Sequence, residues 1–377
     1  MDPALLTDSS FWEDREPFSF GKFPGQLPAE PLLQGSVLFE TSGSSGKPKW
    51  VVISKSALLA SAAAVNEHLE ISSSSCWGLA LPLHHVGGFG IAARAFAADC
   101  RLEIFPRRWD TLAFTIWLEK CGVTHTSLVP AQIYDLVRQQ LRAPSCLRVI
   151  IVGGGRLDAA TGLDARALGW PVLASYGMTE AASQIATQGL CFLKKNYQPS
   201  PIPLLRHWQA RVTTKGLLEI SGPALFSGYI MLEDSVSFFT PRTSAWYLTS
   251  DRVSLEDRLL SPLGRSDTLV KVLGELIDPD EIERELNTLA NGRLAIGSYA
   301  VLAVPDARAG HLLVPVFERR VAPVTAAAVL ADYARQATGL RRLQKCFWID
   351  VIPKSPLGKI MTTELLTRYK NPEGSDS

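Results

Sequence analysis

The chain has 377 residues, too many for one small core, and this length favours two domains of unequal size. Hydrophobic residues make up 46% and charged residues 20%, and the net charge of +1 excludes a global field that recruits nucleic acid or an anionic membrane. The six cysteines are scattered without CxxC pairs or zinc spacing, which predicts free thiols in a reducing cytoplasm. The N-terminal run MDPALLTDSSFWEDREPF is acidic and contains prolines, unlike a signal peptide.

The first half of the chain predicts an arm, a hairpin and a parallel sheet, in that order. Residues 1–35 carry prolines and little periodicity, typical of an arm laid over a core. The β-prone runs SVLFE (36–40) and WVVIS (50–54) flank a loop and predict two strands. Strand and helix patterns then alternate, which predicts a parallel α/β sheet. The predicted helices are 56–69, 111–122 and 131–141, and the predicted strands are 76–83, 124–130 and 147–155.

The apolar stretch from Trp77 to Ala98 is predicted to be buried core and not a membrane span. It contains Pro82, two histidines and Arg94, which are costly in lipid.

The second half predicts a β-rich region followed by a small α+β unit. Helical patterns are absent from about residue 210, and residues 210–222 and 245–261 are typical of antiparallel strands. The tail predicts helices at 280–289 and 327–337 and strands at 297–306, 312–318 and 346–353. We therefore expect an α/β protein with two domains, residues 1–264 and residues 265–377, divided near Gly264.

Residues 41–49 read TSGSSGKPK, a stretch of small and hydroxylated residues that ends in two lysines. Glycine and serine let backbone N–H groups crowd around an anion, and lysine adds charge, so the stretch predicts a phosphate-binding loop. The alternative is a surface turn. The Walker loop does not fit, because only two residues separate Gly43 from Gly46 and Pro48 follows Lys47.

Two further loops follow predicted strands, at the sheet edge where ligands bind in open parallel sheets. In IIVGGGR, the glycines at 153–155 allow a flat base to approach the backbone, or simply form a tight turn. In VLASYGMTEAASQ, Tyr176 offers a stacking face, Thr179 a hydroxyl for phosphate, and Glu180 a hard oxygen ligand for Mg²⁺. This loop is also compatible with an ordinary helix N-terminus.

Taken in order, these motifs resemble the adenylate-forming superfamily of acyl-CoA synthetases, aryl-CoA ligases, peptide-synthetase adenylation domains and luciferases. The resemblance runs from Phe39 to about Thr363 and also covers GLLEISGPALFSGY, YLTSDRV, GRSDTLVKVLGELIDPDEIE and PKSPLGKI. Ser250 replaces a glycine that is usual in the family. About forty residues precede the phosphate loop, fewer than in most members, so part of the acyl pocket or of a dimer surface is expected to differ.

The resemblance implies that ATP and Mg²⁺ bind and that a carboxylate attacks the α-phosphorus. Thr179 is expected at the α-phosphate and Glu180 as the Mg²⁺ ligand. The loop over the β- and γ-phosphates comprises Thr41, Ser42, Gly43, Ser44, Ser45, Gly46 and Lys49. The remaining nucleotide contacts are assigned to Gly153, Gly154, Gly155, Ser175, Tyr176, Gly177, Met178, Asp251 and Arg265, the last two at the ribose.

The same resemblance implies a mobile small domain. Lys359 is expected to bridge the carboxylate and the α-phosphate, and Asp267 to be the hinge of a domain rotation. This rotation brings the face around Gly274 to the site for transfer of the acyl group to a thiol, with coenzyme A as the expected acceptor.

For the acid, His85 is predicted to gate the acyl group and Ser183 to line its pocket. The run SYGMTEAASQIAT particularly resembles the o-succinylbenzoate–CoA ligases of menaquinone synthesis. Aryl or fatty acids, or loading of a carrier protein, remain alternatives. A degenerate nucleotide-binding relative is the non-enzyme alternative. The joint retention of four residues argues against it: Glu180, Asp251, Arg265 and Lys359. The sequence leaves open whether the protein is a homodimer.

Overall fold

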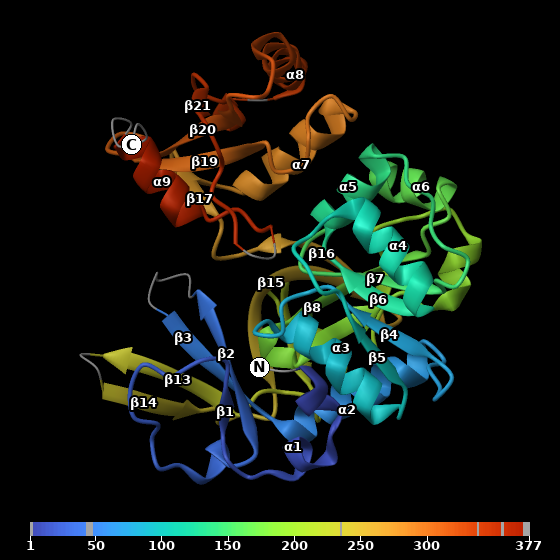
Figure 1. Cartoon of the computed structure of the whole chain (residues 1–377). Coiled ribbons are helices and arrows are strands. Elements are labelled where there is room, and N and C mark those ends of the chain that lie inside the picture. Colours follow the sequence, from blue (N-terminus) through green and yellow to red (C-terminus); the bar gives the residue numbers. More distant parts are fainter. Residues whose placement is uncertain (1–2, 43–47, 234–235, 338, 356–357, 372–377) are drawn as a thin grey trace. The chain divides into compact units, whose positions relative to one another are not determined.

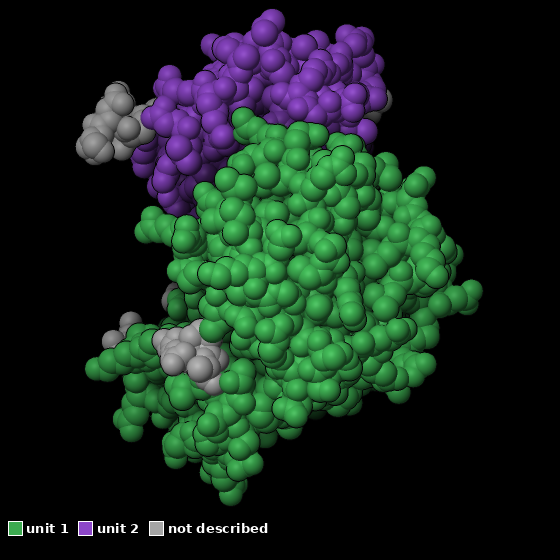
Figure 2. All heavy atoms as spheres, turned by 45° about the vertical axis from the view of Figure 1, so that its right-hand side comes forward, with its two compact units in different colours: residues 1–249, 253–262 green, residues 250–252, 263–377 purple. Residues whose placement is uncertain are grey.

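The computed structural model describes residues 3–42, 48–233, 236–337, 339–355 and 358–371. The chain forms two compact units, one of residues 1–249 with 253–262 and one of residues 250–252 with 263–377 (Figure 2). The long segment of the second unit starts at Leu263, next to the boundary expected at Gly264.

The N-terminal segment of the first unit lies against its core, as predicted. Leu6 and Trp12 are buried, and the Trp12 indole N–H donates to the Leu6 carbonyl oxygen at 2.9 Å. The buried Lys55 ammonium donates to the Asp14 carbonyl oxygen at 2.7 Å, which fastens the middle of this segment to the first turn of α2. The segment contains η1 (Pro3–Thr7), α1 (Ser9–Glu13) and η2 (Pro31–Leu33).

A five-stranded sheet of order β1-β2-β3-β13-β14 contains the predicted hairpin (Figure 1). Its strands β2 and β3 pair antiparallel from Ser36↔Ser54 to Ser42↔Pro48, which confirms the two strands expected around the glycine-serine loop. Both faces of this hairpin are buried, in keeping with its nearly continuous apolar runs. One face packs into the main core, and the other forms a second cluster that includes Leu38, Trp50 and Val52. The five strands are β1 (Phe18–Ser19), β2 (Ser36–Ser42), β3 (Pro48–Ser54), β13 (Gly228–Glu233) and β14 (Val236–Pro241).

The central sheet of the first unit has the order β5-β4-β6-β7-β8-β9 and is parallel except for β9, which confirms the predicted α/β architecture. Helices α2 and α3 pack together on one face, and α4, α5 and α6 cover the other (Figure 1). The strands are β4 (Cys76–Leu79), β5 (Arg101–Ile104), β6 (His125–Leu128), β7 (Val149–Val152), β8 (Val172–Met178) and β9 (Ser183–Thr187). The helices are α2 (Lys55–His68), α3 (Val86–Ala97), α4 (Thr111–Cys121), α5 (Pro130–Arg138) and α6 (Ala159–Ala167).

The β-rich region expected after residue 210 forms a sheet of order β10-β16-β15-β12-β11. Two short 3-10 helices, η3 (Thr179–Ala181) and η4 (Leu190–Lys194), precede it. Its strands are β10 (Ile202–Pro203), β11 (Gln209–Val212), β12 (Leu217–Ser221), β15 (Tyr247–Glu256) and β16 (Leu259–Arg265).

The second unit is a small α+β body with its own core, built around Phe317, Ile282 and Val329. Its sheet has the order β18-β17-β20-β19, with β21 paired to β20. The strands are β17 (Val270–Val272), β18 (Glu275–Ile277), β19 (Tyr299–Asp306), β20 (Gly310–Glu318) and β21 (Phe347–Ile349). The helices are α7 (Pro279–Ala290), α8 (Pro323–Gln336), η5 (Gly339–Arg341) and α9 (Thr362–Lys370).

Within the ranges described above, no helix combines the length and apolar character that a membrane crossing requires.

Candidate active site

The β2–β3 hairpin holds both ends of the predicted phosphate loop. Thr41 lies opposite Lys49, and the Thr41 hydroxyl donates to the Lys49 carbonyl oxygen at 3.3 Å. Ser42 is the last residue of β2. The predicted loop residues 43–46 lie outside the described residues. The hairpin therefore defines where the loop begins and where it rejoins the sheet.

The predicted tyrosine loop is a sterically tight turn between β8 and β9. The pairing of these strands shifts at Gly177, where a Cβ would lie 1.6 Å from the Ser183 carbonyl oxygen. Ala182 and Ser183 have φ values of 47° and 106°, a region that costs a non-glycine residue on the order of 1–3 kcal/mol. This strained turn presents Glu180 from η3 at the carboxyl end of β8.

The other residues predicted in this loop lie on the same strand and turn. The Ser175 hydroxyl lies 3.1 Å from the Thr187 hydroxyl oxygen, which ties β8 to β9. Tyr176 and Met178 are partly buried against the core of the first unit, and Thr179 begins η3.

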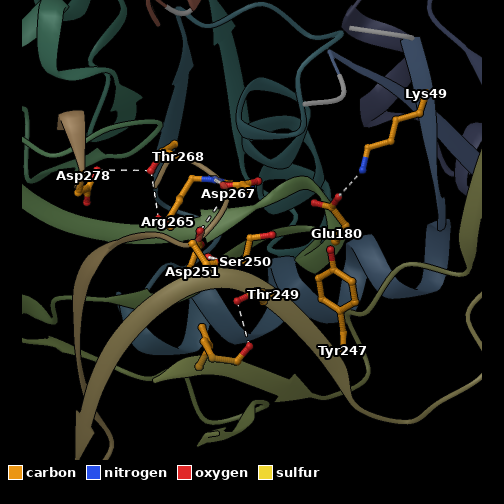
Figure 3. A network of polar contacts seen from close by, with 12 residues as sticks. Lys49, Glu180, Tyr247, Thr249, Ser250, Asp251, Arg265, Asp267, Thr268 and Asp278 are labelled. Carbon is orange, nitrogen blue, oxygen red and sulfur yellow. Dashed lines mark hydrogen bonds and ion pairs between the residues drawn. The ribbon is translucent and has the colours of Figure 1, made fainter. Parts of the chain in front are cut away.

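Glu180 is the centre of a polar cluster within the first unit. Its carboxylate oxygen Oε1 lies 3.6 Å from the Lys49 ammonium and accepts a hydrogen bond from the Tyr229 hydroxyl at 2.9 Å. The Tyr229 and Tyr247 hydroxyls are 3.0 Å apart. Figure 3 shows the Lys49 ammonium and the Glu180 carboxylate pointing toward each other. The sequence predicts Lys49 and Glu180 as site residues but not the two tyrosines, because the contacts join residues 49 and 18 positions apart.

The chemistry of this cluster fits a magnesium–nucleotide site. Mg²⁺ prefers oxygen ligands and is usually held by one or two carboxylates together with substrate phosphates. The Glu180 carboxylate, 14% exposed, already has an ammonium group beside it, so its surroundings accept a cation. Across the described ranges, no three His, Cys, Asp or Glu side chains gather as a protein-only metal site.

The three predicted glycines follow β7 and are accessible. Gly153 is half-buried, Gly154 and Gly155 are exposed, and no atom lies within 4 Å of a Cβ built on Gly153. Gly154 has a φ of 74°, a conformation that glycine adopts without cost. The turn therefore leaves open space over its backbone at the carboxyl end of β7.

Arg94 is a functional candidate that the sequence prediction missed. Its side chain is 1% exposed, yet no carboxylate of the described residues lies within ion-pair distance of it. The guanidinium donates to the Ser127 hydroxyl at 3.4 Å and to the Ser183 hydroxyl at 3.3 Å, and its Nε is buried with no hydrogen-bond partner among the described residues. Burial lowers the pKa of Arg94 to about 9, so it stays charged at neutral pH.

The geometry of α3 explains how Arg94 reaches this position. Helical side chains lean toward the helix N-terminus, and Nη2 of Arg94 would lie 3.1 Å from a Cβ on Gly90, one turn back. The glycine therefore makes room for the guanidinium beside Ser183. Because the Ser183 oxygen accepts from Arg94, the Ser183 hydroxyl proton can be donated to a ligand.

His85, the predicted acyl gate, precedes the same helix. It is the N-cap residue of α3, and its ring centroid lies 4.3 Å from that of the exposed His84. Burial, together with repulsion from His84, lowers the pKa of His85 to about 4, so the ring is neutral at pH 7. Its Nε2 is buried with no hydrogen-bond partner among the described residues.

In the second unit, Arg265 joins two of the predicted residues. Its guanidinium makes a bidentate contact with Asp267, at 2.8 Å and 2.6 Å, and lies 3.3 Å from an Asp251 oxygen (Figure 3). The Arg265 hydrogen bonds, and to a smaller degree the charge of Lys359, hold the pKa of Asp267 below its usual range. The predicted ribose contacts, hinge residue and catalytic lysine are thus near one another in this unit.

Lys359 and Gly274 occupy exposed turns of the second unit. The Lys359 backbone N–H donates to the Ser355 hydroxyl at 3.2 Å, and its carbonyl accepts from the Ser355 N–H at 2.8 Å. Gly274 joins β17 to β18 with a φ of 94°, and a Cβ built on it has no atom within 4 Å.

A family model described as AMP-binding enzyme matches residues 34–230 of this chain. The chain belongs to the AMP-binding enzyme family. The match includes the phosphate-loop hairpin, the glycine turn, η3 and the first half of β13, so this AMP-binding enzyme has its Lys49–Glu180–Tyr229 cluster inside the family region.

This AMP-binding enzyme is similar in sequence to 2-succinylbenzoate–CoA ligases. The ligase of Bacillus cereus strain Q1 is 28% identical over 393 residues, an alignment that covers 97% of this chain and 79% of the relative.

Two solved structures have the same fold. One is the o-succinylbenzoate CoA synthetase MenE from Bacillus subtilis in complex with the acyl-adenylate intermediate OSB-AMP, with a TM-score of 0.72, 24% identity and coverage of 90% of this chain and 70% of that one. The same synthetase has been solved with ATP and a magnesium ion. The other is ATP-bound MatB from Rhodopseudomonas palustris, with a TM-score of 0.74, 24% identity and coverage of 89% and 68%.

Proposed function

We propose that this AMP-binding enzyme is an ATP-dependent acid–CoA ligase that converts 2-succinylbenzoate to 2-succinylbenzoyl-CoA in menaquinone biosynthesis. It forms the acyl-adenylate with release of pyrophosphate and then transfers the acyl group to coenzyme A. Family membership and the ligases to which the chain is similar support the reaction type. The observation that carries the choice of acid is the buried charge of Arg94 beside Ser183.

Arg94 suits an acid that carries a second anionic group. A buried charge without a counter-ion is costly, and this cost is offset when a carboxylate of the ligand approaches. The Ser183 hydroxyl, oriented by Arg94, is a further donor to such a group. 2-Succinylbenzoate has two carboxylates, so one can be activated while the other is attracted by Arg94. A fatty acid or benzoate offers no such second group.

In the first half-reaction, the residues of the first unit hold the nucleotide. The loop of residues 41–46 and Lys49 neutralise the β- and γ-phosphates, and Thr179 donates its hydroxyl to the α-phosphate. Glu180 holds Mg²⁺, which when bound neutralises phosphate charge. The open backbone at Gly153, with the Tyr176 ring, receives the adenine.

The residues of the second unit complete both half-reactions. Asp251 and Arg265 hold the ribose, and Lys359 stabilises the charge that develops where the carboxylate meets the α-phosphorus. Rotation about Asp267 then removes Lys359 and brings the turn at Gly274 to the site, where the coenzyme A thiol displaces AMP. The accessible position of Gly274, with nothing near its Cβ, supports a role as a passage for the thiol.

We place the enzyme in the cytoplasm, a placement supported by its six free cysteines. A homodimer stays a prediction, which light scattering coupled to gel filtration tests.

The proposed function is tested by measuring thioester and pyrophosphate formation with a panel of acids. We expect kcat/KM with coenzyme A to be highest for 2-succinylbenzoate, compared with benzoate and medium-chain fatty acids. A higher value for a fatty acid would contradict the assigned acid and favour an acyl-CoA ligase. Pyrophosphate release without thioester would favour a carrier protein as acceptor. ATP binding without pyrophosphate release for any acid would favour a degenerate nucleotide-binding relative, and no nucleotide binding at millimolar ATP would contradict the proposed function.

A further inference from the structure

Tyr229 contacts both charged members of the cluster at Glu180. It lies on β13, opposite Val51 of β3, in the sheet that holds the phosphate-loop hairpin. Its hydroxyl donates to Glu180 at 2.9 Å, while the Lys49 ammonium lies 4.1 Å from the centre of its ring. With the 3.6 Å contact of Lys49 and Glu180, the three side chains form a closed triangle.

The hydrogen bonds of this cluster have a defined direction. A tyrosine has one hydroxyl proton, and that of Tyr229 is donated to Glu180. In the 3.0 Å contact between the two tyrosine hydroxyls, Tyr247 is therefore the donor. The chain of donors runs from Tyr247 to Tyr229 to Glu180, and each bond polarises the next.

Phe226 fixes the tyrosines and the glutamate in place. It is buried, and its ring centroid lies 4.7 Å from that of Tyr229 and 5.0 Å from that of Tyr247. Its backbone N–H donates to the Glu180 carbonyl oxygen at 2.9 Å. One residue thus anchors the backbone of the glutamate and packs against both rings, so the hydroxyl chain meets the carboxylate at a fixed distance.

We propose that Tyr229, supported by Tyr247, is a positioning residue that holds the Glu180 carboxylate ready for the Mg²⁺ of the incoming nucleotide. This inference deepens the proposed function and rests on it. The Tyr229 hydroxyl holds Oε1, which fixes the orientation of the carboxylate before metal and nucleotide arrive. Before Mg²⁺ binds, the Lys49 ammonium balances the charge of the Glu180 carboxylate. The same ammonium lies over the Tyr229 ring, and Lys49 follows the predicted phosphate loop in the sequence.

The test is the Mg²⁺ dependence of ATP binding in the full-length protein. The dissociation constant of ATP is measured by calorimetry in EDTA and in excess Mg²⁺, and the ratio of the two gives the enhancement by Mg²⁺. Tyr229→Phe keeps the ring and its contact with Lys49 but removes the donor to Glu180. Because a hydrogen bond to a charged group contributes roughly 1.5–3 kcal/mol, we expect the enhancement to fall by about 10-fold or more. ATP binding in EDTA is expected to stay unchanged.

Two further variants distinguish positioning from general damage. Tyr247→Phe removes the second donor of the chain, so we expect a smaller loss of Mg²⁺ enhancement in the same direction. Tyr299→Phe is the matched control, because it deletes a tyrosine hydroxyl that donates to Asn287 at 3.2 Å in the second unit, and we expect wild-type enhancement. If Tyr229→Phe fails to fold, the inference is tested by comparing the Mg²⁺ enhancement of Tyr247→Phe with that of Tyr299→Phe.

Wild-type Mg²⁺ enhancement in Tyr229→Phe and in Tyr247→Phe would overturn the inference. Equal losses of ATP binding with and without Mg²⁺ would also overturn it, because they indicate a structural role. If the wild-type protein binds no ATP under either condition, the proposed function itself fails, a result distinct from the other two.

Discussion

Replacement of Arg94 by methionine is expected to change stability little and activity strongly. Methionine keeps most of the side-chain volume in α3 but removes the charge and the donors to Ser127 and Ser183. In the wild-type protein the guanidinium is 1% exposed, its Nε has no partner among the described residues, and its hydrogen bonds of 3.3 and 3.4 Å are long. Removing it therefore relieves a buried charge at the loss of two long hydrogen bonds and of a contact with the Trp77 ring, whose centre lies 5.3 Å from the guanidinium carbon.

The two contributions to stability are of similar size. Replacing a buried ion pair by apolar groups of similar volume is often neutral or stabilising, by about 1–4 kcal/mol, and removal of Arg94 leaves behind no unpaired carboxylate among the described residues. Leaving two serine hydroxyls without this donor costs about 1 kcal/mol each. The free energy of unfolding is thus expected to stay within about 2 kcal/mol of the wild-type value.

Activity is expected to change far more. Loss of one partner of a buried, hydrogen-bonded charge pair costs about 2–5 kcal/mol, so kcat/KM for 2-succinylbenzoate should fall by roughly 30- to 4,000-fold. For benzoate, which lacks the second carboxylate, we expect little change. The assay measures pyrophosphate release with each acid, and a thermal scan of the same samples measures stability.

Arg166→Met is the matched control. Arg166 is partly buried, and it donates to the backbone carbonyl oxygens of Val172 at 3.0 Å and Leu193 at 3.1 Å. Its loss should lower the melting temperature without changing the preference between the two acids. Equal losses of activity toward both acids in Arg94→Met, or unfolding of that variant, would refute the proposed role of Arg94.

Three further predictions concern the second unit, the tyrosine loop and a histidine. Lys359→Ala should slow adenylate formation by on the order of 10²- to 10³-fold and spare thioester formation from supplied acyl-adenylate, whereas Gly274→Val should do the reverse, as measured in single-turnover assays of each step. Gly177→Ala should lower the melting temperature by several degrees or prevent folding, because its Cβ would lie 1.6 Å from the Ser183 carbonyl oxygen. Because the pKa of His85 is lowered to about 4 in the folded protein, the unfolded chain binds a proton at this residue more readily between pH 6.5 and about 4. The free energy of unfolding therefore falls as the pH falls through this window. His85→Gln should reduce that loss, as measured by urea titrations at several pH values.

Each of these predictions has an outcome that contradicts it. Equal losses in both half-reactions for both variants would argue against a rotating second unit. Wild-type stability of Gly177→Ala would show that the turn at Ser183 relaxes freely. An unchanged pH dependence in His85→Gln would show that this ring does not contribute to acid destabilisation.

Local sequence patterns were sufficient to predict the architecture where the pattern and the packing agree. The alternation of apolar runs and helical patterns predicted the parallel sheet, and the runs around the glycine-serine loop predicted β2 and β3. Helix α3 was not predicted, because three of its first five residues are glycines, which are poor helix formers. Packing explains one of them: a Cβ on Gly88 would lie 2.2 Å from the Pro82 carbonyl oxygen. Strand β5 was also missed, since it is a short edge strand with charged residues.

The candidate site was predicted as motifs, but not as contacts. Glu180 and Lys49 were predicted from separate motifs, while their 3.6 Å contact depends on the fold. Arg94 looked like a lone charge in an apolar run, and only burial without a carboxylate partner in the described residues distinguishes it from a surface residue. Tyr229 ends a motif that carries no chemical signal, because its role depends on a glutamate 49 residues away.

The central claim is that the chain activates 2-succinylbenzoate through an adenylate and passes the acyl group to coenzyme A. The most direct measurement is a single turnover of the full-length protein with ATP, Mg²⁺ and 2-succinylbenzoate, quenched and analysed by mass spectrometry. The account predicts 2-succinylbenzoyl-adenylate in the absence of coenzyme A, and its conversion to the thioester with release of AMP when coenzyme A is added. Consumption of ATP without either product would contradict it. So would turnover of benzoate or a fatty acid by a protein that consumes no ATP with 2-succinylbenzoate.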